Sequence, residues 1–269
     1  MIELTLIGIG TGNPDHLTLQ AAAEIAGADL ILIPLKGADK QDLAGLRRDI
    51  CARHAGPATR IVEFDLPQRD DGAADYRRGV DCWHDAIAAA WRACIAAHLP
   101  RLSGRVALLV WGDPSLYDST LRIAGRLDLP LTCRVIPGIT AIQALCAAHA
   151  IPLNRIGAPV QITTGRRLRD HGWPEGADTV VVMLDGACSF RALPPDGLRI
   201  WWGGFVGMAG QILDHGPLTE AGPRIVRARA RARAAHGWIM DIYLLRRDQP
   251  ISGGGGGAAP GIRMNCDPA

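Results

Sequence analysis

Three glycine- and proline-rich stretches hold the residues of this chain best suited to ligand chemistry. They are residues 8–14 (GIGTGNP), 112–114 (GDP) and 137–138 (PG), and each follows a short apolar run typical of a buried strand. In open α/β sheets, ligands bind beyond the carboxyl ends of the strands. We therefore expect a ligand site between residues 112–117 and 138–141, although each stretch taken alone also fits an ordinary strand-to-helix turn.

The first stretch argues against one common nucleotide-binding loop. The dinucleotide-binding fingerprint G-x-G-x-x-G needs a third glycine where Asn13 stands, and a helix directly after it, where Pro14 interrupts the chain. The second expected strand closes at Pro34 without an acidic residue at the matching place. These departures argue against a nicotinamide-dependent oxidoreductase.

The elements that position these stretches alternate between strands and helices in the first half of the chain. Apolar runs predict strands and helical periodicity predicts helices, the longest of them over residues 76–99 with apolar side chains at three- and four-residue steps. This alternation indicates an α/β fold. The expected strands cover residues 3–8, 30–33, 60–64, 106–110 and 132–136, and the expected helices cover residues 19–26, 43–54, 76–99 and 140–150.

A connection near residue 155 marks the expected boundary between two domains, residues 1–154 and 155–248. Beyond it we expect a helical or turn segment near residues 209–213, while residues 227–235, with arginine at every second position, fit an edge strand or a helix equally well. The tail, residues 249–269, contains five consecutive glycines and has the composition of a disordered segment. The expected strands of this half cover residues 159–163, 178–184, 199–206, 224–227 and 237–245.

Composition excludes several classes of protein. The net charge of +2 gives no argument for a nucleic-acid partner, and no apolar run approaches membrane-spanning length. Seven cysteines without a C-x-x-C pair indicate free thiols in a reducing cytoplasm rather than a disulfide framework or a zinc site. The chain opens directly on an expected strand, so we expect no signal peptide, no membrane partner and a cytoplasmic location.

Taken together, the three stretches resemble the tetrapyrrole methylases. The family's first loop, G-x-G-P-G-D-P followed by L-T-L, corresponds to residues 8–14 and 17–19; its second, G-D-P before an aromatic residue, to residues 112–114 and Tyr117; its third, P-G-x-[ST]-[SA], to residues 137–141. Order and spacing match, and the resemblance covers roughly residues 2–247. It implies an S-adenosylmethionine-dependent methyltransferase of two α/β domains, with a mixed sheet in each domain and the active site in the cleft between them.

Departures from the family pattern narrow the implied activity. Thr11 and Asn13 replace the family's proline and aspartate, residues 39–78 form an insertion, and residues 236–245 read HGWIMDIYLL. Within the family these features resemble the branch that methylates C1 of precorrin-5 and releases the acetyl group as acetate. The alternatives are another precorrin or uroporphyrinogen C-methyltransferase, a diphthine- or ribosomal-RNA-type methylase, and, from a different class, a non-catalytic tetrapyrrole-binding protein.

The resemblance also implies which residues contact the methyl donor. Backbone groups of the loops can hold the donor, and Thr140 can bind it while also capping the following helix. The family has methionine where Leu184 stands, so its neighbour Met183 is also a candidate. The implied donor contacts are Thr11, Gly112, Asp113, Leu116, Thr140, Ala141, Met183, Leu184 and Gly207.

Methyl transfer itself asks little of acids or bases, because positioning in a dry cleft can supply most of the rate. Deacetylation differs, since water must attack the acetyl carbonyl and a general base would help. The candidate bases on the cleft loops are Asp15, His16, Asp113 and Tyr117; the alternative is ordinary water without an enzyme base.

The implied substrate is an apolar macrocycle rimmed with carboxylates. Arginine side chains suit carboxylates, and Arg166 and Arg167 follow an expected strand end, although a solvated loop is an equally ordinary place for them. No cluster of residues with metal-ligand spacing is apparent. The resemblance further implies a homodimer.

Overall fold

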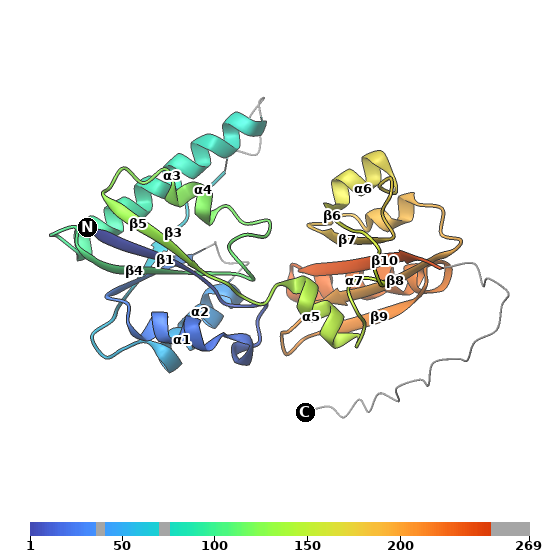
Figure 1. The fold of residues 1–269 in the computed structure, drawn as a ribbon, viewed down its shortest axis with the longest axis horizontal. Helices are drawn as coiled ribbons and strands as arrows, with labels where there is room; N and C mark the ends of the chain where they lie inside the picture. Colours follow the sequence, from blue (N-terminus) through green and yellow to red (C-terminus); the bar gives the residue numbers. More distant parts are fainter. Residues whose placement is uncertain (36–40, 70–75, 249–269) are drawn as a thin grey trace.

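The structure, a computed structural model, describes residues 1–35, 41–69 and 76–248. Its two halves each contain a five-stranded sheet (Figure 1). The predicted tail, residues 249–269, and parts of the predicted insertion, residues 39–78, lie outside the described residues. No described helix combines the length and the apolar character needed to cross a membrane.

The first sheet is entirely parallel, with strand order β3-β2-β4-β1-β5. The expectation of a mixed sheet in each domain is therefore wrong for this half. The reason is that a helix follows each of the first four strands and returns the chain to the same edge, so every strand runs in the same direction. The strands are β1 (Ile2–Gly8), β2 (Leu30–Leu35), β3 (Arg60–Asp65), β4 (Gly104–Val110) and β5 (Leu131–Ile136).

Helices cover both faces of this sheet (Figure 1). Leu108 of β4 packs with Ile87 and Trp91 on one face, whereas its neighbour Leu109 packs with Ile25 and other residues on the opposite face. Burial on both sides explains why the strands read as continuous apolar runs. The helices are η1 (Pro14–His16), α1 (Leu19–Ala26), α2 (Gln41–His54), α3 (Tyr76–His98) and α4 (Thr120–Ala124).

The second sheet is mixed, as predicted, with order β6-β7-β10-β8-β9. Only the β6–β7 pair within it is parallel. The strands are β6 (Val160–Thr164), β7 (Thr179–Met183), β8 (Leu198–Gly204), β9 (Ile212–Pro217) and β10 (Asp241–Arg247). The accompanying helices are α5 (Ala141–Ala148), α6 (Gly165–His171), η3 (Ser189–Ala192) and α7 (Leu218–His236).

One prediction for this half is wrong. Residues 224–227 do not form a strand but lie inside α7, which also includes the undecided residues 227–235. The segment predicted as helical or turn near 209–213 is a turn at residues 209–210, and its last two residues open strand β9. Helical spacing buries Ala221, Ile225 and Ala232, and Arg229 is held against the sheet by its ion pair with Asp241. Helical spacing thus puts Arg229 on the buried face and leaves Arg227, Arg231 and Arg233 exposed.

Helix α5 packs on the second sheet rather than the first. Ile142, Ala144 and Leu145 share a buried cluster with Val181 of β7 and with Leu244 of β10. The predicted boundary at residue 155 places α5 in the first domain, whereas its packing favours a crossing between the two halves near residues 137–140.

Candidate functional site

The three predicted loops meet at the edge of the first sheet where β1, β4 and β5 end. Gly10 and Gly112 form two backbone hydrogen bonds, of 2.8 and 3.3 Å. A Cβ at Gly138 would lie 2.1 Å from the Gly112 carbonyl oxygen, and a Cβ at Gly8 would lie 2.5 Å from the Gly138 nitrogen. Glycine is required here because the backbones of the loops touch.

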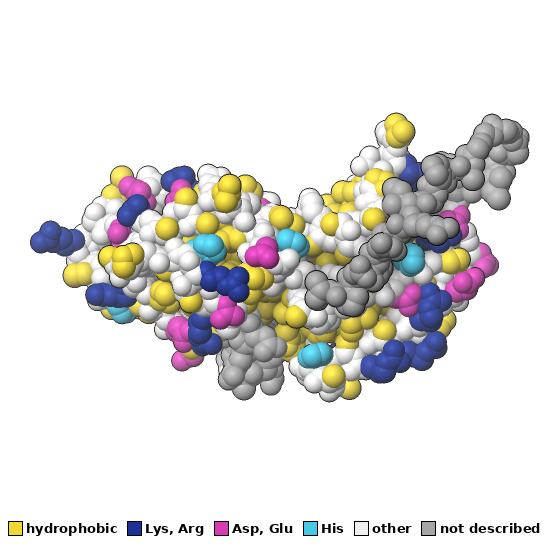
Figure 2. All heavy atoms as spheres, turned by 90° about the horizontal axis from the view of Figure 1, so that it is seen from below, with side chains coloured by type: hydrophobic (Ala, Val, Ile, Leu, Met, Phe, Trp, Pro, Cys, Tyr) yellow, Lys and Arg dark blue, Asp and Glu magenta, His cyan; other side chains and the backbone are white. Residues whose placement is uncertain are grey.

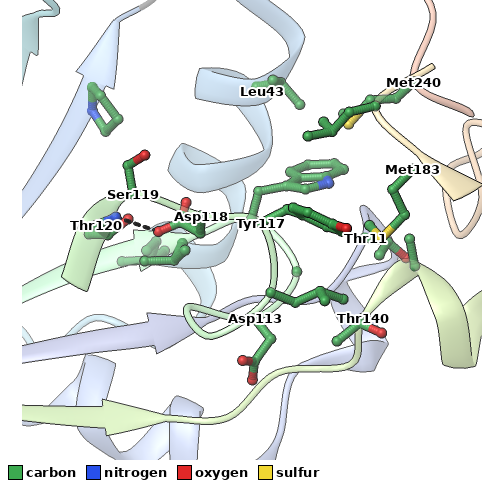
Figure 3. A pocket seen from close by; sticks show the side chains of 18 of the residues that line it. Thr11, Leu43, Asp113, Tyr117, Asp118, Ser119, Thr120, Thr140, Met183 and Met240 are labelled. Atoms are coloured by element: carbon green, nitrogen blue, oxygen red, sulfur yellow. Dashed lines mark hydrogen bonds between the residues drawn. The ribbon is translucent and has the colours of Figure 1, made fainter. Parts of the chain in front are cut away.

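Asp113 ties two of these loops together. Its buried carboxylate accepts hydrogen bonds of 2.8 Å from the backbone N–H of Ser115 and 2.8 Å from that of Gly138, and a further one from the Ser115 hydroxyl. Burial raises the pKa of the Asp113 carboxyl, but these hydrogen bonds outweigh it, so the pKa lies below its ordinary value. In Figure 3 the carboxylate points away from Thr11, Tyr117 and Met183.

A cavity of about 520 Å³ lies between the two halves of the molecule. Hydrophobic side chains gather in the hollowed waist there (Figure 2), and the side chains of Thr11, Tyr117, Thr140 and Met183 converge on one space (Figure 3). The side of the cavity built by the predicted loops and the end of β7 is called the loop wall here. It consists of Thr11, Gly112, Leu116, Tyr117, Thr140, Ala141, Met183 and Leu184.

Thr11 lines this cavity and carries a buried polar group. Its side chain is 3% exposed, and its hydroxyl has no hydrogen-bond partner among the described residues. Gly207 stands behind it, where a Cβ would come within 2.6 Å of the Thr11 hydroxyl oxygen. Because an unsatisfied buried hydroxyl is destabilising, the position is suited to a ligand that supplies the missing hydrogen bond.

The loop wall also has open space beside its backbone. Gly112 has φ +66° and open space where a side chain would stand, and Leu184, with φ +53°, leaves its side chain 67% exposed. Thr140 caps α5, with its hydroxyl accepting from the Ile142 N–H at 3.2 Å in a capping box with Gln143. The capping role predicted for Thr140 is confirmed, and its contact with a methyl donor stays a prediction.

Five predicted site residues do not line the cavity. Asp15 is exposed and His16 is partly buried beside Gly10, both on η1, and Arg166 and Arg167 lie exposed in the first turn of α6. Gly207 contributes indirectly, through Thr11. The roles predicted for all five in binding or catalysis stay predictions.

Tyr117 does line the cavity, on a backbone with φ +49°. Burial raises the pKa of its phenol, and the positive charge of Arg167 partly opposes this effect. Arg167 is therefore close enough for its charge to act at the phenol from the other half of the molecule. A phenol with a raised pKa remains protonated at neutral pH, which suits hydrogen-bond donation better than base catalysis.

A second set of lining residues escaped prediction. It is called the helix wall here and consists of Leu43, Ala44 and Arg47 on α2 with Trp83, Ile87 and Trp91 on α3. The helix and its apolar stripe were correctly predicted for α3, but spacing alone does not distinguish a core from a cavity wall. The available signal for Arg47 was its position one helical turn before the buried Ile50 and Cys51, where a charged residue is unusual.

Arg47 is 9% exposed, and backbone carbonyl groups hold its guanidinium. Nε donates to the carbonyl oxygen of Leu109 at 2.9 Å, and Nη1 donates to that of Leu43 at 3.0 Å. Burial lowers the pKa of Arg47 to about 10, while the negative charge of Asp118 acts in the opposite direction. Asp118 also lines the cavity, and one of its carboxylate oxygens accepts the Thr120 N–H at 2.6 Å (Figure 3).

The two tryptophans of β8, Trp201 and Trp202, do not line the cavity. Trp202 is fully buried in the core and donates its indole N–H to Asp241 at 2.9 Å, while Trp201 lies under the guanidinium of Arg246. Among residues with described positions, no group of three or more histidine, cysteine or acidic side chains is arranged to hold a metal ion.

Known proteins are similar to this chain in sequence and in architecture. The family model for tetrapyrrole (corrin/porphyrin) methylases matches residues 3–222. The precorrin-6A synthase [deacetylating] of Sinorhizobium sp is 48% identical over 252 residues, which cover 92% of this chain and 96% of that protein. The precorrin-2 C(20)-methyltransferase of the same organism is 32% identical over 180 residues, covering 61% of this chain and 69% of the relative.

Solved structures have a similar fold. A cobalamin synthesis related protein (CobF) from Corynebacterium diphtheriae superposes with a TM-score of 0.80 at 40% identity, covering 93% of this chain and all of that one. At 18% identity, the uroporphyrin-III C-methyltransferase of Thermus thermophilus complexed with S-adenosylhomocysteine shares the fold, with a TM-score of 0.52 over 91% of this chain and 92% of that one. By its sequence, its fold and the convergence of its three loops, the chain belongs to the tetrapyrrole methylase family.

Proposed function

We propose that the protein transfers a methyl group from S-adenosylmethionine to C1 of precorrin-5 and releases the acetyl group as acetate, giving precorrin-6A. The observation that carries this proposal is the cavity in which all three family loops converge. The choice of reaction within the family is supported by the precorrin-6A synthase that is 48% identical over nearly its whole length.

The loop wall fits the methyl donor. The unpartnered Thr11 hydroxyl and the backbone at Leu184 can supply hydrogen bonds, the open space beside Gly112 lets the donor approach the loop, and Leu116 and Ala141 can supply apolar contact. When bound, S-adenosylmethionine supplies an electrophilic methyl group on a sulfonium, and S-adenosylhomocysteine is the product. The contribution of the chain is to hold donor and acceptor in line and to exclude water.

The acidic tetrapyrrole would enter through the waist of the molecule. Arg166 and Arg167 at the start of α6 are positioned on the second half, and Arg167 acts electrostatically on Tyr117 across the opening. Guanidinium groups bind carboxylates through paired hydrogen bonds, so these two arginines are suited to the rim of the substrate.

Of the four predicted bases, Tyr117 lines the cavity and has a hydroxyl without a hydrogen-bond partner among the described residues. Asp113 is occupied by hydrogen bonds from Ser115 and Gly138, and Asp15 and His16 stand outside the cavity lining. We therefore assign Tyr117 to hydrogen-bonding the acetyl carbonyl, with water as the attacking group.

The test is to incubate the purified protein with S-adenosylmethionine and precorrin-5 and to measure S-adenosylhomocysteine, acetate and the mass of the tetrapyrrole. One acetate released per methyl transferred supports the proposal. Methyl transfer without acetate assigns the chain to another tetrapyrrole C-methyltransferase, and binding of the macrocycle without turnover assigns it to a non-catalytic binding protein.

A cytoplasmic location and a homodimeric state belong to the same proposal. Light scattering on the purified protein tests the dimer directly: a mass near twice that of the 28.7 kDa chain supports it, and a mass equal to the chain contradicts it.

A further inference from the structure

Arg47 is a buried cation whose surroundings in the described structure do not balance its charge. Its two observed hydrogen bonds go to neutral carbonyl groups, of Leu109 and Leu43, and it forms no ion pair with a described carboxylate. Taking a charged group out of water is costly unless an opposite charge and further hydrogen bonds compensate. The third nitrogen, Nη2, forms no hydrogen bond within the described residues and belongs to a side chain that lines the cavity.

The other charged side chains that line the cavity are Asp113, Asp118 and Asp241, and none of them forms a described ion pair with Arg47. Asp113 accepts three hydrogen bonds within the loops, and Asp241 accepts from Arg229 and Trp202, each at 2.9 Å. Asp118 acts on Arg47 electrostatically, but its described hydrogen bond is from the Thr120 N–H, at 2.6 Å, and it forms no described ion pair with Arg47. Arg47 is thus a cation within the described cavity that is open to an anion brought by a ligand.

The cavity that Arg47 lines is largely apolar and contains large side chains. Leu66, Trp83, Ile87 and Trp91 line it, and Trp83 is fixed by donating its indole N–H to the Pro67 carbonyl at 2.7 Å. In such surroundings a charge-assisted hydrogen bond is stronger than in water. The combination of one guanidinium and aromatic walls suits a carboxylate attached to, or released from, an apolar molecule.

We infer that Arg47 forms a carboxylate-binding site on the helix wall, and that it takes either the acetate formed in the reaction or a carboxylate that the tetrapyrrole keeps throughout. This identification of the two sources rests on the proposed function. The site itself rests on the burial, the hydrogen bonds and the open cavity face of Arg47.

The experiment uses sodium acetate as the probe and the complete protein saturated with S-adenosylhomocysteine. Acetate is titrated while the tryptophan indole N–H signals are followed by two-dimensional NMR, with Trp83→Phe used to assign the Trp83 signal. We expect a saturable shift of the Trp83 signal in the wild type. In Arg47→Lys, which keeps the charge but loses the paired geometry, the dissociation constant should rise by about tenfold.

Two further variants separate binding from folding. Arg48→Gln is the matched control, because Arg48 follows Arg47 directly but is exposed and pairs with Glu63, so acetate affinity should stay within about twofold. Asp118→Asn removes the negative charge that acts on Arg47, so acetate should bind more tightly, by about threefold. A gain in affinity cannot arise from a damaged fold.

Repeating the acetate titration in the presence of the product, precorrin-6A, identifies the source of the carboxylate. If acetate still binds when precorrin-6A occupies the protein, Arg47 holds the departing acetate; if precorrin-6A excludes acetate, Arg47 holds a carboxylate that remains on the ring. If S-adenosylhomocysteine alone abolishes acetate binding, Arg47 serves the donor's carboxylate and the inference is wrong.

An acetate affinity that is identical in the wild type, Arg47→Lys and Asp118→Asn would also overturn the inference, while methyl transfer by the wild type would leave the proposed function intact. Conversely, Arg47-dependent acetate binding in a protein without methyl transfer would retain the site and reject the function.

Discussion

The loop wall and the helix wall line the same cavity but present different chemical groups to it. The loop wall offers backbone groups and one unpartnered hydroxyl, and its shape depends on glycines where a single added Cβ would strike another loop. The helix wall offers large apolar side chains and one buried guanidinium. A ligand shared by many enzymes can be held by backbone, whereas a wall of side chains can differ between enzymes that use different substrates. From this difference we propose that the methyl donor binds the first wall and the tetrapyrrole the second.

The substitution expected to destabilise the loop wall most is Gly138→Ala. The added Cβ would lie 2.1 Å from the Gly112 carbonyl oxygen, so the loops must separate, and we expect a loss of more than about 3 kcal/mol in the free energy of unfolding. Denaturant unfolding measures this loss. Gly125→Ala is the control, because its Cβ would meet no atom closer than 3.7 Å, and wild-type-like stability of Gly138→Ala would contradict the packing of the loops.

Asp113→Asn tests whether Asp113 joins the loops or acts as a base. The amide can accept from only one of its two backbone donors, so we expect a loss of roughly 1–3 kcal/mol in the free energy of unfolding at neutral pH. The folded-state pKa of Asp113 lies below its ordinary value, so its ionised form stabilises the protein above the unfolded-state pKa, and that contribution is lost as the pH falls through the folded-state pKa.

The difference between wild type and Asp113→Asn should therefore be full at neutral pH and shrink below about pH 4. Unfolding curves at several pH values measure it. A difference that grows as the pH falls would contradict the assignment.

Thr11→Val separates ligand binding from stability on the loop wall. The valine matches the shape of threonine and removes a hydroxyl that has no partner in the described structure, so stability should be unchanged or rise by up to about 1 kcal/mol. The affinity for S-adenosylhomocysteine, measured by calorimetry, should fall by roughly fivefold to tenfold. An unchanged affinity would remove Thr11 from the donor site.

The smallest effect is expected for Asp15→Asn. Asp15 is exposed on η1 and does not line the cavity, so acetate release should change by less than about twofold. Single-turnover measurement of acetate release is the readout, with Tyr117→Phe as the cavity-facing comparison. A loss of about 100-fold in Asp15→Asn would identify Asp15 as the general base and contradict the geometry.

The sequence predicted the loop wall better than the helix wall for a physical reason. Glycine and proline mark loops locally, and parallel strands bring their carboxyl ends to one edge, so residues 8–14, 112–114 and 137–138 could be placed together without a structure. Arg47 instead depends on the carbonyl of Leu109, 62 positions away, and the stripe of Trp83 and Trp91 has the same spacing whether it faces a core or a cavity.

The same limit explains the errors in the fold. Helix α7 was divided between a strand and an undecided segment because alternating arginines satisfy the exposed positions of either structure, and the ion pair between Arg229 and Asp241 that holds the helix to its sheet is not a local signal. The all-parallel arrangement of the first sheet followed from the connecting helices, whereas the expectation of a mixed sheet came from the family resemblance.

The most direct test of the two-wall account is a crystal structure of the protein with S-adenosylhomocysteine. The account predicts that the ligand lies against the loop wall, with a hydrogen bond to the Thr11 hydroxyl, and that it leaves Arg47 without a ligand contact. A complex in which the carboxylate of S-adenosylhomocysteine pairs with Arg47 would contradict it.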